Sequence, residues 1–438
     1  LIGSNLGGNE VSGSISDGGA EGGLVVTKGS GGKWILSGEN THTGGTVHMQ
    51  GTLHLNNAKA LGSGDFDVTH TNSATIGNSS GSAIVLEGTG VVRIVRQLIF
   101  EGPNDLSFGE HPVEFLGTGN SSFRGVTVST GELTFNGVVS DGEGTSPETP
   151  IVKNGNGTLT LGGANTFTVG LTLAVGRLNI NNAQALGNGV FNISAPNATI
   201  DNTSGSAIVL STNNDQVWNF NELVFVGSND LDMGTGMVSL GTVGSFTKVV
   251  NVAAGTLTIG GVISDGDGSR NSLTKRGAGA LTLAGSNNLT GTLTLEAGTL
   301  NLNNAGAVGF GIFTIAGTGN EKFLDNTSGG AVVLVNGNTQ NWNGDFTFVG
   351  SNDLDLGMGV ISLGSGGGTR TMTVLGSTLT VSGDILSTNK TLVKAGEGAL
   401  TLSGLNGFTA AGGVSLQAGT LNLAGEQVLG SGRLTIEE

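Results

Sequence analysis

The chain of 438 residues contains no cysteine and no tyrosine, only five prolines, and few charged residues, which make up 11% of it. Without cysteine there can be no disulfide framework, thiolate metal site or cysteine nucleophile. No run of 18 apolar residues occurs, so the sequence predicts no membrane-spanning helix. Only 17 residues are basic and the net charge is −16, so almost nothing could neutralise the phosphates of a nucleic-acid partner.

Glycine, by contrast, is abundant: 82 residues, or about 19% against an ordinary usage of about 7%. A collagen is excluded because glycine does not recur at every third position and proline is scarce. A charged disordered tail is excluded because 36% of the chain is hydrophobic. Apolar and small polar residues alternate in stretches such as GTLTLG and GTLNLN, and this period of two predicts short strands. The glycines between the strands indicate tight turns.

The sequence repeats itself at intervals of about 120 residues, which identifies a repeat architecture. One leucine of the most similar segment recurs at spacings of 125, 122 and 119 residues, as Leu36, Leu161, Leu283 and Leu402. Neither end carries an atypical capping segment, so we expect repetitive sequence to flank both ends. We expect one continuous solenoid divided into the tail of a preceding repeat (1–28), repeat 1 (29–153), repeat 2 (154–275), repeat 3 (276–394) and the start of repeat 4 (395–438).

The predicted fold is all-β: a parallel β-helix, or β-solenoid, built from these units of about 120 residues. Short strands would stack at about 4.8 Å, with one face toward a narrow core and glycine at the corners. The alternative is a string of separate β-sandwiches. We rank it second because the strands are short, the glycine is dense and no tryptophan-centred core marks each unit.

The segment LTKRGAGALTLAGSNNLTGTLTLEAGTLNLNN, residues 273–304, resembles the autotransporter-associated β-strand repeat, and all four copies match its pattern. The motif covers about 32 residues of each unit. The tyrosine usual in the motif is replaced by His42, Phe167, Leu289 and Phe408. The resemblance implies the passenger region of a bacterial surface protein, folded as a right-handed parallel β-helix outside the cell.

A lysine holds one repeat position in all four copies: Lys28, Lys153, Lys275 and Lys394. One hypothesis is a surface ladder of cations that grips an acidic glycan or a neighbouring fibre. We favour corner lysines that form exposed ion pairs with the acidic row just before them, which would contribute little each. That acidic row is Asp17, Asp141, Asp265 and Asp384.

All five histidines lie in the first full unit, which suggests a metal site. The repeat argues against it, because His42 and His48 take inward positions whereas His54 takes an outward one; the others are His70 and His111. We expect no metal there.

The aspartate-rich turns suggest calcium, which binds several oxygen ligands, but aspartate also favours turns without an ion. We predict no metal, and the positions to watch are Asp265, Asp267, Asp353 and Asp355.

Trp218 and Trp342 share a repeat position. They could stack on sugars if exposed, but we favour large rings that fill a coil corner.

No nucleophile motif and no polar insertion breaks the repeat, so the sequence predicts no catalytic residue, no cofactor and no enzyme. The leading hypothesis is a structural or adhesive segment of a large exported bacterial surface or filament protein, a rigid stalk or fibre that associates with itself end to end or laterally. The alternative is a module that binds an extracellular glycan or a host surface. The third is a polysaccharide-active β-helix enzyme. We expect an extracellular or cell-surface location, with no nucleic acid and no membrane span.

Overall fold

The computed structural model describes residues 1–19, 21–69, 74–116, 124–142, 149–241, 247–266, 270–317, 321–386 and 388–437. These residues form 45 short strands and no helix, and the strand pairs within each unit are parallel. The chain divides into two compact units, Leu1–Val217 and Trp218–Glu438. The expected parallel β-solenoid is confirmed.

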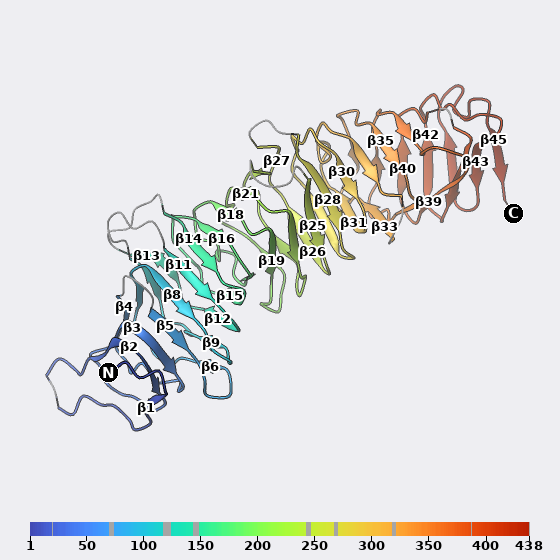
Figure 1. Cartoon of the computed structure of the whole chain (residues 1–438). Helices are drawn as coiled ribbons and strands as arrows, with labels where there is room; N and C mark the ends of the chain where they lie inside the picture. The colour runs from blue at the N-terminus through green and yellow to red at the C-terminus, as the bar shows by residue number, and fades with distance from the viewer. Residues whose placement is uncertain are drawn as a thin grey trace. The chain divides into compact units, whose positions relative to one another are not determined.

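The first unit holds twenty strands and the start of β21. Figure 1 draws it in blue to green, from the N-terminus onward. They are β1 (Asn9–Val11), β2 (Val26–Leu36), β3 (Thr46–Leu55), β4 (Phe66–Val68), β5 (Ala74–Gly77), β6 (Ile84–Val85), β7 (Val92–Ile94), β8 (Gln97–Phe100), β9 (Leu106–Ser107), β10 (Val113–Phe115), β11 (Gly125–Val128), β12 (Glu132–Phe135), β13 (Val139–Asp141), β14 (Ile151–Asn154), β15 (Thr158–Leu161), β16 (Leu171–Leu173), β17 (Arg177–Ile180), β18 (Phe191–Ile193), β19 (Asn197–Asp201), β20 (Ile208–Val209) and β21 (Gln216–Trp218).

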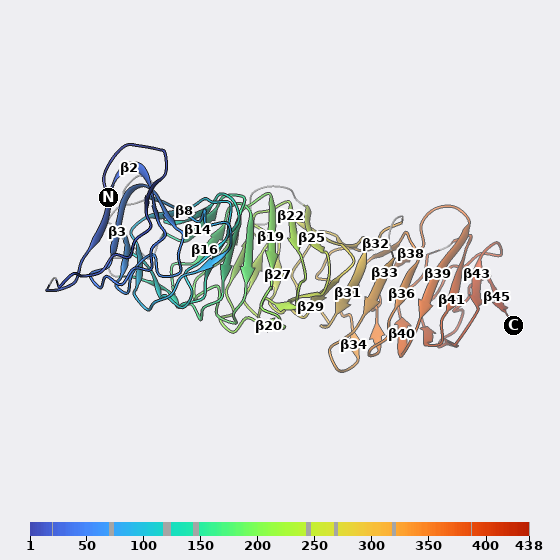
Figure 2. The same cartoon turned by 90° about the horizontal axis from the view of Figure 1, so that it is seen from below.

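The second unit holds the remaining strands, of which β36, β39, β41, β43 and β45 lie side by side in Figure 2. They are β22 (Glu222–Phe225), β23 (Leu231–Asp232), β24 (Val238–Ser239), β25 (Thr247–Val252), β26 (Thr256–Ile259), β27 (Ile263–Ser264), β28 (Ser272–Arg276), β29 (Ala280–Leu283), β30 (Leu293–Leu295), β31 (Gly298–Leu302), β32 (Phe313–Ile315), β33 (Lys322–Asp325), β34 (Val332–Val333), β35 (Gln340–Trp342), β36 (Phe346–Phe348), β37 (Leu354–Asp355), β38 (Ile361–Ser362), β39 (Gly368–Val374), β40 (Thr378–Val381), β41 (Lys390–Ala395), β42 (Ala399–Leu402), β43 (Gly413–Leu416), β44 (Thr420–Leu423) and β45 (Arg433–Ile436).

Each coil has three faces, and the interior is built from stacked apolar side chains. In the first unit β10, β11 and β12 form one coil, and each pairs with its successor in the next coil, β13, β14 and β15. Leu133 pairs with Leu159 and Leu159 with Leu178, and all three are buried. The period of two therefore turns every second side chain into the core, as the sequence predicts.

The repeat of about 120 residues does not return to the same face of the coil. In the first unit five successive pairings lead from Lys28 through His48 and on to Asp141. Lys153, the repeat equivalent of Lys28, lies on the next face of the coil, where it pairs with Val126. In this unit the long strands β2 and β3 join the two faces into one sheet. The second unit behaves alike: Lys275 pairs with Leu295 in one sheet, whereas Lys394 pairs with Met372 and Leu416 in another. One repeat thus makes about five and a third coils within each unit.

Candidate functional site

The four repeated lysines are buried at corners of the coil, not at its surface. Each side chain is 0% exposed, and each ammonium donates to backbone carbonyls. Lys275 Nζ lies 2.9 Å from Arg276 O, 2.8 Å from Gly277 O and 2.9 Å from Ala297 O, so it joins two successive corners. Lys153 and Lys394 make the same three bonds to their own corners, and Lys28 makes two, to Ser30 O and Gln50 O.

In the second, third and fourth copies, glycines shape the carbonyl cup that receives the ammonium. Gly155 and Gly176 have φ of +78° and +79°, in the left-handed region that side chains disfavour. A Cβ at Gly176 would lie 2.3 Å from Gly155 O and 3.0 Å from Lys153 Nζ. The corner therefore excludes any side chain at this glycine and leaves carbonyls that need a donor.

Burial lowers the pKa of all four lysines, because an ammonium away from water loses its solvation. The pKa of Lys153 falls to about 8 and that of Lys275 to about 7. The three carbonyls supply dipoles but no opposite charge.

Both hypotheses for these lysines are therefore wrong. A surface ladder would need exposed cations stacked on one face of the coil, whereas these are buried, and Lys28 and Lys153 lie on different faces of the coil. The aspartates bind elsewhere: both Asp141 and Asp265 accept hydrogen bonds from the backbone N–H and hydroxyl of a threonine, Thr168 and Thr290. Asp17 does the same with Thr43, and Asp384 accepts from the N–H of Leu405. No ion pair within the described ranges joins the two rows.

A buried asparagine in each copy ties three coils together. Asn287 Oδ1 accepts from Ile263 N at 2.8 Å in the preceding coil, and its Nδ2 donates to Ala307 O at 2.6 Å in the following one. The equivalents Asn40, Asn165 and Asn406 make the same pair of bonds. Sequence reasoning missed this residue, although it is asparagine in all four copies, in SGENT, GGANT, AGSNN and SGLNG.

The histidines do not form a metal site among the described residues, where no group of three metal-ligating side chains occurs. His42 and His48 are buried, as expected for inward positions. His54 was expected to face outward, but it is only 5% exposed, and its Nδ1 lies 2.7 Å from Ser79 Oγ in the next coil. His111 is also buried, with Nδ1 2.6 Å from Gly90 O, and His70 lies outside the described residues.

The two tryptophans are buried, which overturns the sugar-stacking hypothesis for them. Trp218 is 1% and Trp342 is 0% exposed. Their ring centroids lie 5.3 Å from Phe220 and 5.2 Å from Phe346, respectively. The rings therefore fill the interior, where their large apolar area stabilises the fold.

Of the four aspartates considered above for calcium, each one that the structure describes accepts hydrogen bonds from its own turn or a neighbouring coil. Asp353 Oδ1 accepts from Thr378 N, and Asp355 accepts from Gly357 N and Ser382 Oγ. Asp265 binds Thr290, as described above, and Asp267 lies outside the described residues. These bonds are those of turns and coil-to-coil clamps.

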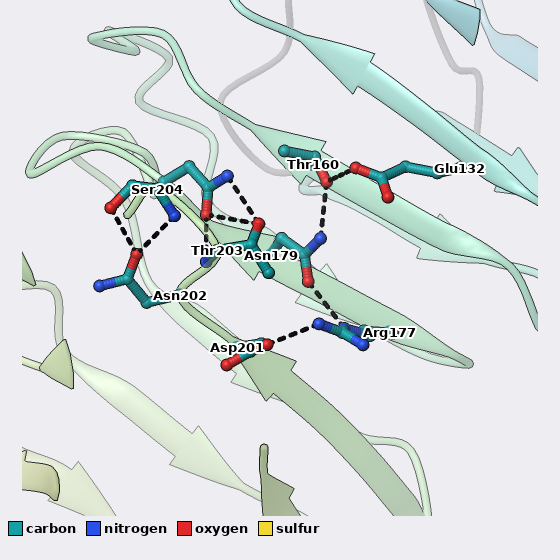
Figure 3. A network of polar contacts seen from close by, with 9 residues as sticks. Glu132, Thr160, Arg177, Asn179, Asp201, Asn202, Thr203 and Ser204 are labelled. Carbon is teal, nitrogen blue, oxygen red and sulfur yellow. Dashed lines mark hydrogen bonds and ion pairs between the residues drawn. The ribbon is translucent and has the colours of Figure 1, made fainter. Parts of the chain in front are cut away.

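Polar ladders also run across the outer face of the first unit (Figure 3). Arg177 reaches from β17 to the buried carboxylate of Asp201 on β19, with Nη2 2.6 Å from Oδ2, and its Nε donates to Asn179. Asn179 donates in turn to Thr160, which donates to Glu132. Nearby, Asn202 Oδ1 accepts hydrogen bonds from the backbone N–H and the hydroxyl of Ser204. Asn202 is fully buried, so the Asn-x-Ser/Thr sequon that it begins is not accessible for glycosylation in the folded chain.

One cleft in the second unit gathers charged, hydroxyl and aromatic side chains. Its volume is about 460 Å³, and β33, β36 and β39 form its floor. Arg370 Nη1 lies 2.9 Å from Asp345 Oδ1, which also accepts from Thr371 N. Glu321, Phe323 and three threonines (Thr347, Thr371 and Thr373) complete the wall.

The coils and their repeated corners define a β-solenoid repeat protein, and comparison with protein families names the repeat. Residues 26–55, 151–180, 273–302 and 392–423 match the family model of the passenger-associated-transport-repeat. The chain thus contains this repeat four times, which confirms the resemblance found in the sequence. Each matched segment contains the corner lysine, and the last three also contain the glycine whose carbonyl the lysine binds.

A curated relative is the adhesin BmaC autotransporter of Brucella suis biovar 1 (strain 1330), 28% identical over 298 residues. The match covers 67% of this chain and 8% of the relative, so the chain spans a small part of that protein's length. No solved structure gave a significant match. The repeats and this relative identify the chain as a β-solenoid segment of an exported, cell-surface protein.

Within the described part of the chain, no helix is long and apolar enough to span a membrane.

Proposed function

We propose that the chain is a non-catalytic structural segment, a stiff β-solenoid that holds binding surfaces away from the cell. The observation that supports it best is the asparagine clamp, which ties each corner to the coils before and after it in all four copies. Together with continuous parallel ladders, these clamps resist separation of neighbouring coils. The exposed carboxylates of the cleft also favour a structural role, because a glycosidase needs one carboxyl kept protonated by burial.

Single-molecule pulling of the whole chain, tethered at its two ends, tests the proposal. Pairing partners lie 19 residues apart at Leu36 and Leu55 and 28 apart at Leu98 and Val126. A chain that yields coil by coil should therefore lengthen in steps of about 70–100 Å, since an extended residue spans about 3.5 Å. Extension without measurable force, or in steps of about 120 residues, would refute a stiff solenoid.

The finer part of the proposal is adhesion, either to another copy or to another surface. An exposed valine recurs in three copies between two inward residues: Val85, Val209 and Val333 are 59%, 62% and 52% exposed. The recurrence of an exposed apolar side chain at one position of three copies supports contact with a partner. We expect sedimentation to show self-association that the triple substitution V85T/V209T/V333T weakens, and an ideal monomer at high concentration would contradict it.

A further inference from the structure

The cleft of the second unit differs from the equivalent surface of the first unit. Glu321, Lys322 and Phe323 occupy the repeat positions of Asn197, Ala198 and Thr199. Lys322, like Ala198, is buried, so the change that reaches solvent is the acidic and aromatic pair around it. A change of this kind in one copy is not required by the stacking of the coils, because the other copy folds without it.

The strand register places these side chains together on the outer face. Phe323 pairs with Thr347 and Thr347 with Thr373, so a half-buried ring stands beside two hydroxyls in consecutive coils. Thr371 lies two residues before Thr373 on the same face, next to Asp345. These residues line one open cleft of about 460 Å³, within the range of small-molecule sites.

The polar atoms of the cleft have unused bonding capacity. Asp345 is 59% exposed and uses Oδ1 for both of its hydrogen bonds, which leaves Oδ2 for a ligand. No hydrogen bond joins the hydroxyls of Thr347, Thr371 or Thr373 to another residue within the described ranges. The guanidinium of Arg370 holds Asp345 in place by this ion pair and by donating to Asn343 O at 2.8 Å.

We propose that this cleft binds a neutral saccharide, with one sugar ring against Phe323 and its hydroxyls on Asp345, Glu321 and the threonines. The apolar C–H face of a pyranose fits an aromatic ring, and carboxylates accept hydrogen bonds from sugar hydroxyls. The exposed carboxylates of Glu321 and Asp345 disfavour an anionic sugar, because Arg370 is already paired with Asp345, Lys322 is buried and the chain carries a net charge of −16. The inference goes beyond the structural role, which does not require a ligand.

The test measures binding of methyl glycosides of glucose, galactose, mannose and N-acetylglucosamine to the whole chain, by saturation-transfer NMR and titration. Methyl galacturonide serves as the anionic probe. We expect at least one neutral glycoside to bind with a millimolar Kd and the galacturonide to bind at least tenfold more weakly. Phe323→Thr and Glu321→Asn, which restore the residues of the first unit, should each weaken binding at least tenfold.

Thr199→Phe is the matched control, since it places a ring at the equivalent position without this acidic surround, and it should create no second site. An unchanged unfolding midpoint in F323T and E321N shows that these variants fold. The proposal is overturned if no neutral glycoside binds, if F323T binds like the parent chain, or if the galacturonide binds equally well. Each of these failures would leave the coil-by-coil extension under force unchanged, so it is distinguishable from failure of the structural proposal.

Discussion

The second and third copies of the repeat share one interior and differ on their outer faces. Inside, Lys153 and Lys275 close the same carbonyl cup, and Asn165 and Asn287 make the same three-coil clamp. Outside, Arg177 reaches Asp201 where the third copy has Thr299, and that copy has Phe323 where the second has Thr199. Stacking therefore constrains the interior, whereas individual outer positions are free to acquire binding chemistry.

The largest effect is expected for Asn287→Ala, which removes part of the shared interior. The Ile263 N–H and the Ala307 carbonyl would both lose a buried partner, and each such loss costs about 1–3 kcal/mol. We expect the free energy of unfolding to fall by about 2–4 kcal/mol, measured by denaturant titration. The exposed neighbour Asn288→Ala is the control, and equal losses in the two variants would contradict the clamp.

Lys275→Met tests the charge in the carbonyl cup. Because burial lowers the pKa of Lys275 to about 7, the unfolded chain binds more protons than the folded one between pH 7 and its ordinary value of 10.5. This lysine therefore makes stability rise with pH across that window, by on the order of 2 kcal/mol.

In Lys275→Met this lysine no longer contributes to the slope of the free energy of unfolding against pH. Unfolding titrations at pH 7, 8.5 and 9.5 measure that slope. The exposed Lys59→Met is the control and should keep the slope of the parent chain. An identical slope in Lys275→Met would mean that the ammonium is hydrated in the folded state.

Arg177→Thr gives the second copy the outer residue of the third. It removes the guanidinium that pairs with the buried carboxylate of Asp201 in the second copy. We expect a loss of about 1–2 kcal/mol in the free energy of unfolding. Thr299→Arg is the matched control and should change stability by less than about 0.5 kcal/mol. The reverse order of effects would mean that the network of Figure 3 is not stabilising.

His54→Asn introduces the residue that the second and third copies have at this position. Burial lowers the pKa of His54 to about 4, so between pH 6.5 and 4 the unfolded chain binds the proton first and stability falls with falling pH. On acidification from pH 7 to 4.5, the free energy of unfolding should fall by about 1 kcal/mol less in the asparagine variant than in the parent chain. Equal acid sensitivity in unfolding titrations would contradict the burial of His54.

The sequence was sufficient to predict the class of fold, because period-two strands between glycines have few other solutions. It could not predict that one repeat makes about five and a third coils. Coil length varies between 19 residues at Leu36 and 28 at Leu98, so a spacing near 120 does not divide into whole coils. The equivalents Lys28 and Lys153 therefore looked like a stacked row, although they lie on different faces of the coil.

The candidate sites were less predictable, because their surroundings are made by backbone atoms. Lysine is rarely buried without a carboxylate, and only the carbonyls freed by Gly155 and Gly176 make the corner favourable for Lys153. The cleft depends on residues from three coils, Phe323, Asp345 and Arg370, that are brought together by register alone. A comparison of the copies position by position would have found the change at Phe323.

Acylation of lysines by an N-hydroxysuccinimide ester at pH 8, followed by peptide mass spectrometry, tests most directly whether the repeated positions belong to the interior. The side chain of Lys59 is 46% exposed, whereas Lys28, Lys153, Lys275 and Lys394 are 0% exposed. We expect Lys59 of the native chain to be labelled at least tenfold faster than those four, and all five to react after unfolding. If Lys275 is accessible, its lowered pKa makes it a good nucleophile, so labelling of Lys275 as fast as Lys59 would show that the repeated lysines are not in the interior.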